Sequence, residues 1–390
     1  MFKLSGRASA SALATVSLAL SLAGLALPIH AADGAAQVKG EPRIEFTDST
    51  PAKLGSLKRV AITNVVLEFQ TKVFAEEITG RLSKMYLSRG NSYSDNVLAG
   101  FDAKRLEEAA NRVYEKLKAD LTAAGFEVVP EAELKAQPLY EKLRTEMAYP
   151  QGYHFGNTDG HSLVVGPTSL PIYLPPVGEQ GTFSVHKKLK GSAQAPERSW
   201  GDNARMSSTS SYVAGWEVDL AKSLNAHLVR AWYLVGFGGA TAATDWDAIN
   251  TAHFSTTATS RTGASAAMYI REGQTRIAFR TPDGDRAYAR ESSRISALRG
   301  GYRAYDGDVV VRLDETLPGQ MDFLAEGGVQ KTEEDKPSGF LGMLSGAAKS
   351  LSGTTADNSY KTQVDPQRFA DAAVELVGAV QPLLLAKVKR

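Results

Sequence analysis

The chain has no cysteine among its 390 residues. This absence excludes disulfide bonds, thiol nucleophiles, thiolate metal sites and the acylated cysteine that anchors a bacterial lipoprotein. An excess of charge of either sign is also missing: without Lys3 and Arg7, which lie in a predicted leader, the chain has 42 basic and 43 acidic residues. Because acidic and basic residues are nearly equal in number, the chain has no net electrostatic field that attracts nucleic acid or anionic lipid. We expect no nucleic-acid partner.

The first residues have the composition of a cleavable secretory signal peptide. Lys3 and Arg7 precede an apolar stretch, residues 12–27, and the small residues Ala31 and Ala32 follow it. The stretch has about 16 residues, fewer than the roughly 20 that a spanning helix needs. We therefore predict cleavage near Ala31, a location in the periplasm, at the outer membrane or outside the cell, and no membrane-spanning segment in the mature chain.

The remaining chain is predicted to form one α/β (α+β) domain. Residues 32–55 are polar, with Gly and Pro at intervals, and indicate an irregular lead-in, whereas residues 56–390 alternate strand and helix patterns. We expect a mixed sheet with helices packed on it, an antiparallel second half and a C-terminal helix. Long insertions are expected at about 71–101, 150–212 and 330–360.

The first half begins with a strong strand signal. Residues 59–69 are β-branched and nearly all apolar, and their alternation changes phase at Asn64, which indicates a bulge or a strand buried on both faces. Asp102 is a predicted N-cap for an amphipathic helix that ends at Gly125, and a short strand follows over 126–129. Between these elements the spacing predicts a helical segment in the first insertion, with the apolar positions Phe74, Ile78, Leu82 and Met85 on one face and a loop over 89–95.

The second half reads mainly as antiparallel strands. A short helix over 216–224 precedes a strand over 226–236, and the glycines of 236–239 are interpreted as the strand's exit. Residues 264–270 and 276–280 are predicted to form a hairpin about Gly273, and a further strand is expected over 309–313. At the C-terminus, Asp365 and Pro366 are an N-cap and first-turn pair that open a helix, which Pro382 should kink or end.

Two short patterns resemble a bacterial envelope module. The helix end at residues 124–134, Ala-Gly-Phe-Glu-Val-Val-Pro-Glu-Ala-Glu-Leu, and the later Leu-Ala-Lys-Ser-Leu-Asn-Ala-His-Leu-Val of 220–229 are similar to the α/β domain of curli-secretion-channel-like proteins and to the amino-terminal domain of the Tol-Pal translocation protein. The lipoprotein cysteine, a pair of amphipathic transmembrane hairpin strands and a β-propeller repeat are not evident. The resemblance therefore implies a periplasmic adaptor or assembly factor rather than a pore, and it brings no catalytic residues.

The best polar constellation is the segment 153–161. It places His154, Asp159 and His161 on one glycine-containing loop, with two imidazoles and a carboxylate as ligands for a metal or as a general base. Surface histidines on a loop are the alternative interpretation. No catalytic set and no cofactor are predicted elsewhere.

A second candidate is a surface for a partner or a membrane. Apolar residues recur at helical spacing in a segment with few charges, and two tryptophans lie in polar loops. The residues concerned are Phe340, Leu341, Leu344 and Leu351, with Trp200 and Trp246. Trp216 and Trp232 are instead predicted to be core residues.

These features favour an exported, non-enzymatic protein, periplasmic or associated with the outer membrane, that acts by binding partners in envelope assembly or surface export. Envelope proteins or the outer-membrane surface are the expected partners, and the sequence gives no oligomeric state. The alternative is a metal-dependent enzyme or a soluble ligand-binding protein that uses the 153–161 loop.

Overall fold

In the computed structural model, contacts divide the chain into two units, Met1–Ala35 and Ala36–Arg390, and the fold below is that of the second unit. The structure describes residues 42–46, 51–83, 86–157, 160–173, 187–188, 213, 215–246, 258–284, 308–319, 322–332 and 355–388.

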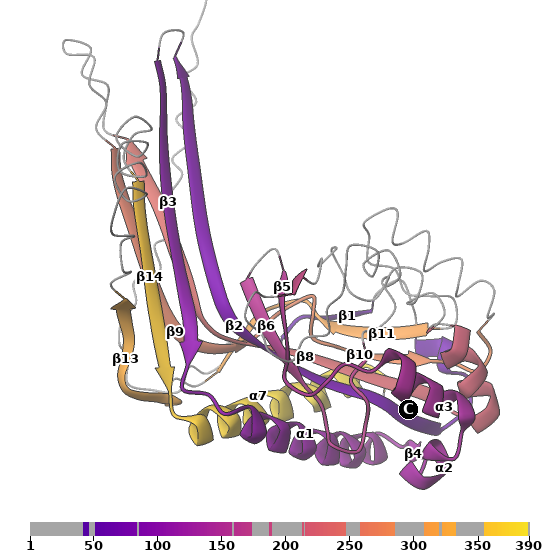
Figure 1. The fold of residues 1–390 in the computed structure, drawn as a ribbon. Coiled ribbons are helices and arrows are strands. Elements are labelled where there is room, and N and C mark those ends of the chain that lie inside the picture. Colours follow the sequence, from indigo (N-terminus) through magenta and orange to yellow (C-terminus); the bar gives the residue numbers. More distant parts are fainter. Residues whose placement is uncertain are drawn as a thin grey trace, which may run out of the picture. The chain divides into compact units, whose positions relative to one another are not determined.

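The described strands form one mixed sheet, which confirms the predicted α/β class (Figure 1). The path through the sheet is β1-β11-β10-β8-β2-β3-β14-β13, and β4, β5, β6, β7, β9 and β12 pair off this path. The strand bounds are β1 Ile44–Phe46, β2 Arg59–Ser83, β3 Tyr86–Ala99, β4 Glu127–Val128, β5 Tyr153–Asn157, β6 Gly160–Val165, β7 Lys187–Lys188, β8 His227–Trp246, β9 Ala258–Ile270, β10 Arg276–Arg280, β11 Asp308–Leu313, β12 Leu317–Pro318, β13 Leu324–Thr332 and β14 Thr355–Val364. The helix bounds are α1 Ala103–Ala123, α2 Glu131–Lys135, α3 Pro138–Lys142 and α7 Pro366–Ala386, with a 3-10 turn at Pro51–Leu54, a π-helical turn at Leu143–Met147 and a helix over 215–224.

Strand β2 is the centre of the sheet. Every residue from Val60 to Gln70 is buried, and β2 pairs with β8 in parallel, with a shift in register between Ile62 and Asn64. The predicted bulge and the predicted burial on both faces are both confirmed. The shift at Asn64 turns its side chain to the face opposite α7, where it donates to the carbonyl of Tyr173.

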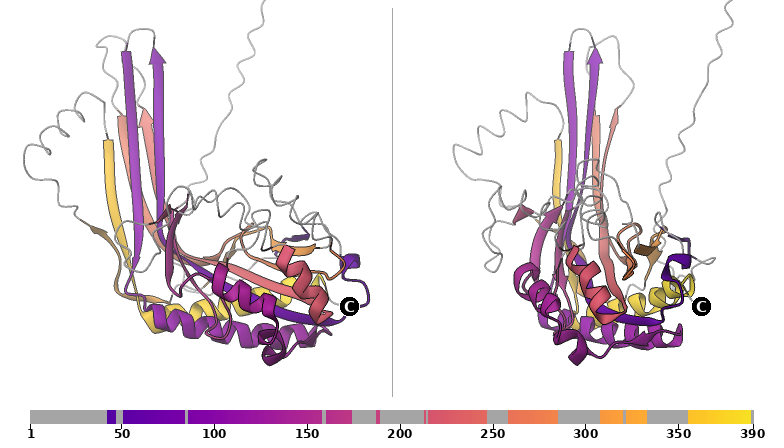
Figure 2. Two further views of the ribbon diagram at one scale, coloured as in Figure 1. Left: turned by 45° about the vertical axis from the view of Figure 1, so that its right-hand side comes forward. Right: turned by 90° about the vertical axis from the view of Figure 1, so that its right-hand side faces the viewer.

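Helices α1 and α7 cover one face of the sheet, side by side (Figures 1 and 2). The side chain of Asp102 accepts from the backbone N–H of Lys104 and caps α1, and Asp365 caps α7 in the same way through Arg368. Gly125 follows α1 at a φ of +92°, which a side chain would strain. The predicted ends of α1 and the predicted start of α7 are therefore confirmed.

Helix α7 continues past Pro382 to Ala386, so the proline does not end it. By length and composition alone α7 could cross a membrane, which the sequence reading of the mature chain overlooked. Its inner face is buried instead: Phe369 packs at 5.7 Å from the ring of Phe69 on β2 and at the same distance from Phe323. We therefore assign α7 to the protein core.

The predicted helical segment and loop within 71–101 are wrong. Strand β2 runs on to Ser83, turns, and pairs antiparallel with β3 from Lys72↔Val97 to Ser83↔Tyr86. The four-residue spacing of Phe74, Ile78 and Leu82 fits a strand face as well as a helix face, because four is a multiple of the strand period of two. The segment is therefore a long antiparallel hairpin, where the sequence had suggested a helix and a loop.

Two expectations for the second half are also wrong. Glycines 236–239 do not end a strand, because β8 continues to Trp246 and pairs with β9 over this stretch. Strands β9 and β10 do not pair with each other; both are antiparallel to β8, one after the other along its length, and the turn with Gly273 separates them. The expected strand over 309–313 is confirmed as part of β11, and Trp216 and Trp232 are core residues as predicted.

Candidate functional site

Two long hairpins, β2–β3 and β8–β9, extend beyond the part of the sheet that the helices cover (Figures 1 and 2). We call this region the arm: β2 from Lys72, β3, β8 from Gly236, β9, β13 and β14. The remainder of the sheet with its helices is the body.

The edges of β2 explain how the arm begins. Leu67 pairs with Val165 of β6 and with Tyr233 of β8, so these two strands lie on opposite edges of β2. Lys72 pairs with His161 of β6 and Val97 of β3, which are also on opposite edges. Strand β3 therefore continues the edge that β8 leaves, and β8 turns away to form the second hairpin with β9.

The two hairpins of the arm are joined by polar side chains. Asn96 on β3 donates through Nδ2 to the carbonyl of Ser265 on β9 at 3.1 Å, and its Oδ1 accepts from the Thr362 hydroxyl of β14 at 2.8 Å. Ser94 donates to the carbonyl of Gly263 at 2.9 Å. Side chains of β3 thus bind the backbone of β9. The β2–β3 hairpin can come this close to the β8–β9 hairpin only where β8 and β9 carry small residues.

Glycines of β8 permit this close approach. A Cβ at Gly236 would lie 2.0 Å from the ring of Tyr269, and one at Gly238 would lie 2.1 Å from the carbonyl oxygen of Ser265. Neither distance is possible for real atoms: a side chain at Gly236 would displace the ring of Tyr269, and one at Gly238 would displace the backbone of β9. These glycines, interpreted from sequence as a strand exit, are therefore a packing requirement of the arm.

We expect Asn96→Leu to loosen the arm without unfolding the body. The substitution keeps the branched shape and the number of side-chain heavy atoms but removes the bonds to Ser265 and Thr362. It leaves a part-buried carbonyl and a buried hydroxyl without these partners, at about 1–3 kcal/mol for a fully buried group. Amide exchange followed by mass spectrometry should accelerate in β3, β9 and β14 and stay unchanged in β10 and β11. Acceleration throughout the chain would contradict a local role.

The opposite face of the first hairpin is more apolar. The rings of Phe74 and Tyr93 stack at 6.3 Å, and the Val97 side chain is 37% exposed, unusual among the large apolar residues of the described chain. Among them on the same face, Lys72, opposite Val97, and Asp95, opposite Phe74, form an ion pair at 2.5 Å. The arm therefore has a hydrogen-bonded inside, and its outer face near the base combines apolar side chains with one ion pair.

The arm has open strand edges. No described strand pairs with β2 beyond Val73 on the edge that β6 occupies lower down. Within the described residues, β9 pairs as a strand only with β8 and, at its last two residues, with β12. No other described strand occupies its second edge, although side chains of β3 and β14 bind the carbonyls of Thr262, Gly263 and Ser265. Unpaired N–H and C=O groups along such edges are ready partners for another strand.

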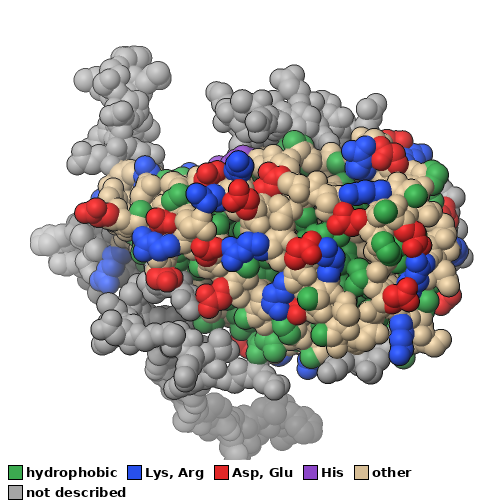
Figure 3. All heavy atoms as spheres, turned by 90° about the horizontal axis from the view of Figure 1, so that it is seen from below, with side chains coloured by type: hydrophobic (Ala, Val, Ile, Leu, Met, Phe, Trp, Pro, Cys, Tyr) green, Lys and Arg blue, Asp and Glu red, His purple; other side chains and the backbone are tan. Residues whose placement is uncertain are grey.

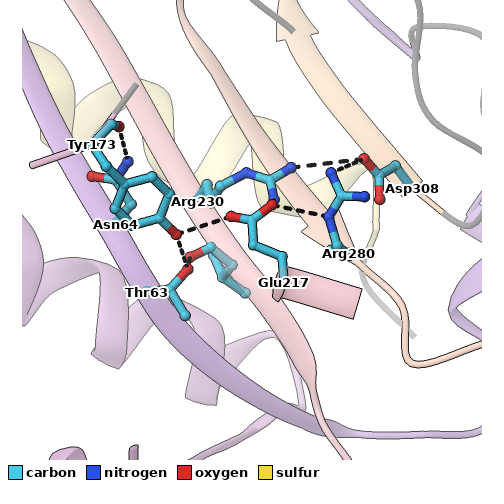
Figure 4. Close-up of polar contacts among 8 residues, drawn as sticks. Thr63, Asn64, Tyr173, Glu217, Arg230, Arg280 and Asp308 are labelled. Atoms are coloured by element: carbon cyan, nitrogen blue, oxygen red, sulfur yellow. Dashed lines mark hydrogen bonds and ion pairs between the residues drawn. The ribbon is translucent and has the colours of Figure 1, made fainter. Parts of the chain in front are cut away.

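A second polar feature lies inside the body, where two arginines and two acids are almost completely buried (Figure 4). Glu217, from the helix over 215–224, accepts from Arg230 of β8 and from Nε of Arg280 of β10, the latter at 3.1 Å. Arg280 also lies 3.0 Å from Asp308 of β11. This buried ion cluster joins one helix to three strands.

Tyr173 extends the buried ion cluster. Its hydroxyl donates to Glu217 at 2.9 Å and lies 2.9 Å from the hydroxyl of Thr63 on β2. Burial, followed by the nearby Glu217 carboxylate, raises the pKa of Tyr173 well above its usual value, so this hydroxyl remains a donor. Because the four charged side chains are 0–4% exposed, the cluster fixes the helix to the sheet and presents no group to a substrate.

The sequence reading missed the buried ion cluster. Its signal was a charged residue within or directly at the end of an apolar strand: Arg230 lies inside β8, Arg280 ends β10 and Asp308 begins β11. Charged residues are almost never buried unless they are paired, so these three positions implied partners that sequence alone could not name.

The structure brings two of the three predicted metal ligands near each other. His154 and His161 lie on the paired strands β5 and β6, where His161 is two residues from the position opposite His154, and Asp159 is outside the described residues. Burial lowers the pKa of both imidazoles, and Lys72 lowers that of His161 further. No group of three His, Cys, Asp or Glu residues suited to a metal occurs in the described part of the chain.

The metal hypothesis remains a prediction with a direct test. If the loop binds Zn²⁺, the purified protein should retain about one equivalent after dialysis, and His154→Ala with His161→Ala should abolish retention and the accompanying rise in melting temperature. His253→Ala is the matched control. Metal-free protein with equal stability in all three forms would reject the hypothesis.

The predicted partner surface is outside the described residues at Phe340, Leu341, Leu344, Leu351 and Trp200. Trp246 is the last residue of β8 and pairs with Ala258 of β9, so the backbone places it on the second hairpin rather than in a loop.

Comparison with protein families, curated proteins and solved structures found no match to this chain. The resemblance to curli-secretion-channel-like proteins therefore stays a prediction. The outer surface of α1 and α7 does not indicate a binding site for a charged partner, because acidic and basic side chains are interspersed across it (Figure 3). The arm, with its open edges, is the candidate functional site.

Proposed function

We propose that this protein is an exported, non-enzymatic component of the periplasm or outer membrane that acts in envelope assembly or surface export by strand pairing through its arm. The observation that carries the proposal is the pair of open edges on β2 and β9. The partner that these edges fit best is a second copy of the same chain.

Two different open edges on one chain favour a head-to-tail arrangement. If β2 of one copy pairs with β9 of the next, each copy still has one edge available, and the contact repeats until a ring closes or a filament forms. Main-chain hydrogen bonds supply the affinity, because each added residue pair satisfies backbone groups that are otherwise left to water. Closure into a ring would remove the exposed edges altogether.

The dimensions of the arm support a location at the outer membrane. Residues 74–83 of β2 span about 33 Å at roughly 3.3 Å per residue, close to the 30 Å apolar thickness of a bilayer. Phe74, Tyr93 and Val97 give the arm an apolar outer patch near its base.

The test uses the absence of cysteine, since any introduced thiol is unique. We expect a chain with Ala75→Cys on β2 and Ala264→Cys on β9 to give a ladder of dimers, trimers and larger species with a short bismaleimide. Each single variant should give no species above a dimer, because one thiol per copy cannot propagate. Ala119→Cys with Ala379→Cys, at exposed positions of α1 and α7, is the control.

A ladder from the control pair equal to that from the arm pair would reject pairing through the arm. If only monomer is found at protein concentrations up to that in the cell envelope, with detergent or lipid vesicles present, self-assembly is rejected.

A further inference from the structure

The sheet has two terminal strands in addition to the open edges of the arm. Along the path of the sheet, β1 is the last strand at one end and β13 is the last strand at the other. Among the described strands, none pairs with the outer edge of either. A terminal strand with free N–H and C=O groups can pair with another molecule, so these two edges could compete with the arm.

Strand β1 is too short and too charged to compete. It comprises only the three residues Ile44–Phe46. Its central residue, Glu45, forms ion pairs with Arg43 at 3.9 Å and with Arg312 at 3.7 Å. Very short edge strands with charged side chains resist pairing between molecules.

Strand β13 is longer, but a bulge interrupts it. Leu324 lies opposite Val364 of β14, and the next pair is Val329 with Thr362. Strand β13 thus advances five residues where β14 advances two, so it has three residues in excess between its two paired parts. Such excess residues bend a strand and break the regular row of backbone groups along its edge.

The bulge is a built feature of β13 and not a frayed end. Gly327 and Gly328 have φ values of +95° and +53°, which residues with a side chain rarely adopt. On one side of the bulge, the carbonyl of Leu324 accepts from Nη2 of Arg368 on α7 at 2.7 Å. The side chains of Leu324 and Val329 are partly buried against the main hydrophobic core, so both sides of the bulge are fixed.

The open edges of the arm have no comparable interruption. Beyond Val73, β2 pairs with β3 as far as Ser83 without a shift in register. Strand β9 pairs with β8 from Ala258 to Ala266 in the same regular way. The terminal strands of the sheet are therefore blunted, whereas the edge strands of the arm are long and straight in register.

We propose that the β13 bulge determines which edges assemble: it withholds the β13 edge from other copies, so that copies meet through β2 and β9 alone. The inference rests on the proposed strand pairing and adds its specificity. A third edge available for pairing would let each copy bind more than two neighbours, and a head-to-tail ring or filament would branch. The bulge keeps the number of contacts for each copy at two.

Deletion of residues 326–328 tests the proposal, because it removes the excess residues and retains both paired parts of β13. Ala325 then lies opposite Gln363, and pairing with β14 runs from Leu324 to Thr332 without a shift in register. We expect the straightened edge to pair with the same edge of a second copy.

Cross-linking of the full-length chain measures this contact. With Gln330→Cys as the single thiol, on an exposed residue of β13, a short bismaleimide should give at least about tenfold more dimer with the deletion than without it. Ala119→Cys on α1 should give the same yield in both chains. No increase at position 330 in the folded deletion variant would overturn the proposal.

The matched control deletes residues 326–327 only. One excess residue then remains, so the register still shifts, and the yield of dimer from Gln330→Cys should stay near that of the undeleted chain. Equal yields from the two deletions would show that the length of the segment matters and its register does not, which contradicts the proposal.

A second variant leaves the chain length unchanged. Gly327→Val with Gly328→Val places two β-branched residues where the bulge needs left-handed backbone, so the bulge should be destabilised and the dimer from Gln330→Cys should rise several-fold. If the deletion prevents folding, this variant decides, and an unchanged yield rejects the proposal. The arm pair Ala75→Cys with Ala264→Cys reports separately on the proposed function: without a ladder that function fails, and the yields at position 330 still decide whether the bulge protects the β13 edge.

Discussion

Glu217→Ala should lower the free energy of unfolding by about 3–5 kcal/mol, the largest effect expected from any single substitution in the body. Removal of this carboxylate leaves Arg230 and Arg280 buried together, with only Asp308 of the two acids remaining in the buried ion cluster. It also removes the carboxylate acceptor of the Tyr173 hydroxyl and leaves that hydroxyl the Thr63 hydroxyl as its partner in this cluster. Urea unfolding followed by tryptophan fluorescence measures the change, since Trp216 is beside the substituted residue in the sequence.

The control for this prediction is an ion pair on the surface. Asp371 pairs with Arg112 between α7 and α1, where both side chains are about half exposed. Exposed pairs contribute little because water and salt screen them. Asp371→Ala should therefore change stability far less than Glu217→Ala, and equal effects would show that the buried ion cluster has no special role.

Glu217→Gln separates charge from shape in the same cluster. The amide keeps the size and an acceptor for Tyr173, but it leaves an excess of buried positive charge on Arg230 and Arg280. We expect most of the loss seen with alanine to persist, because the uncompensated charge costs more than the missing hydrogen bond.

Sequence patterns predicted the elements that neighbouring residues determine, such as helix starts and the bulge in β2. The caps Asp102 and Asp365 fixed the starts of α1 and α7, and the change of phase at Asn64 indicated the bulge in β2. The spacing in the 71–101 segment did not decide between helix and strand, because four-residue steps satisfy both periods. Pairing with β3 decided it, and pairing is a contact that the segment alone does not encode.

The candidate sites were harder to predict for the same reason. The buried ion cluster joins Glu217 to Arg280, 63 positions away, and the arm joins Asn96 to Ser265, 169 positions away. Sequence analysis did not single out Arg230 or Arg280, and no local pattern gives the partners of either residue. Which edges of the arm lack a partner strand depends on the order of strands in the sheet. No sequence motif encodes this order.

Shortening the first hairpin should abolish assembly and leave the body folded. Glu76 and Tyr93 are directly opposite each other in the register, so an Asn-Gly turn can replace residues 77–92 without a shift in pairing. The edge of β2 beyond Val73 that no described strand occupies is then reduced to residues 74–76. In the Ala75→Cys, Ala264→Cys background we expect the bismaleimide ladder to fall at least about tenfold, since strand pairing depends on the number of adjacent backbone bonds.

The body should tolerate this change because neither of the two clusters of buried apolar residues in the described chain extends beyond Val73 along β2. A melting temperature within about 2–4 °C of the parent protein would confirm an intact body. The matched variant replaces residues 241–263 between Ala240 and Ala264, which are also directly opposite, so that β9 keeps only residues 264–270 and the second hairpin is shortened instead. If β2 and β9 supply the two sides of one contact, either shortened hairpin should prevent the ladder when present in every copy.

Mixing the two shortened proteins then tests the head-to-tail arrangement. A copy with a short β2–β3 hairpin retains a full β9 edge, and a copy with a short β8–β9 hairpin retains a full β2 edge. The mixture should give cross-linked dimers that contain one copy of each kind and nothing larger, because the remaining edges of such a dimer are both short. Ladders beyond the dimer, or dimers of either kind alone, would mean that copies associate through a surface other than the arm.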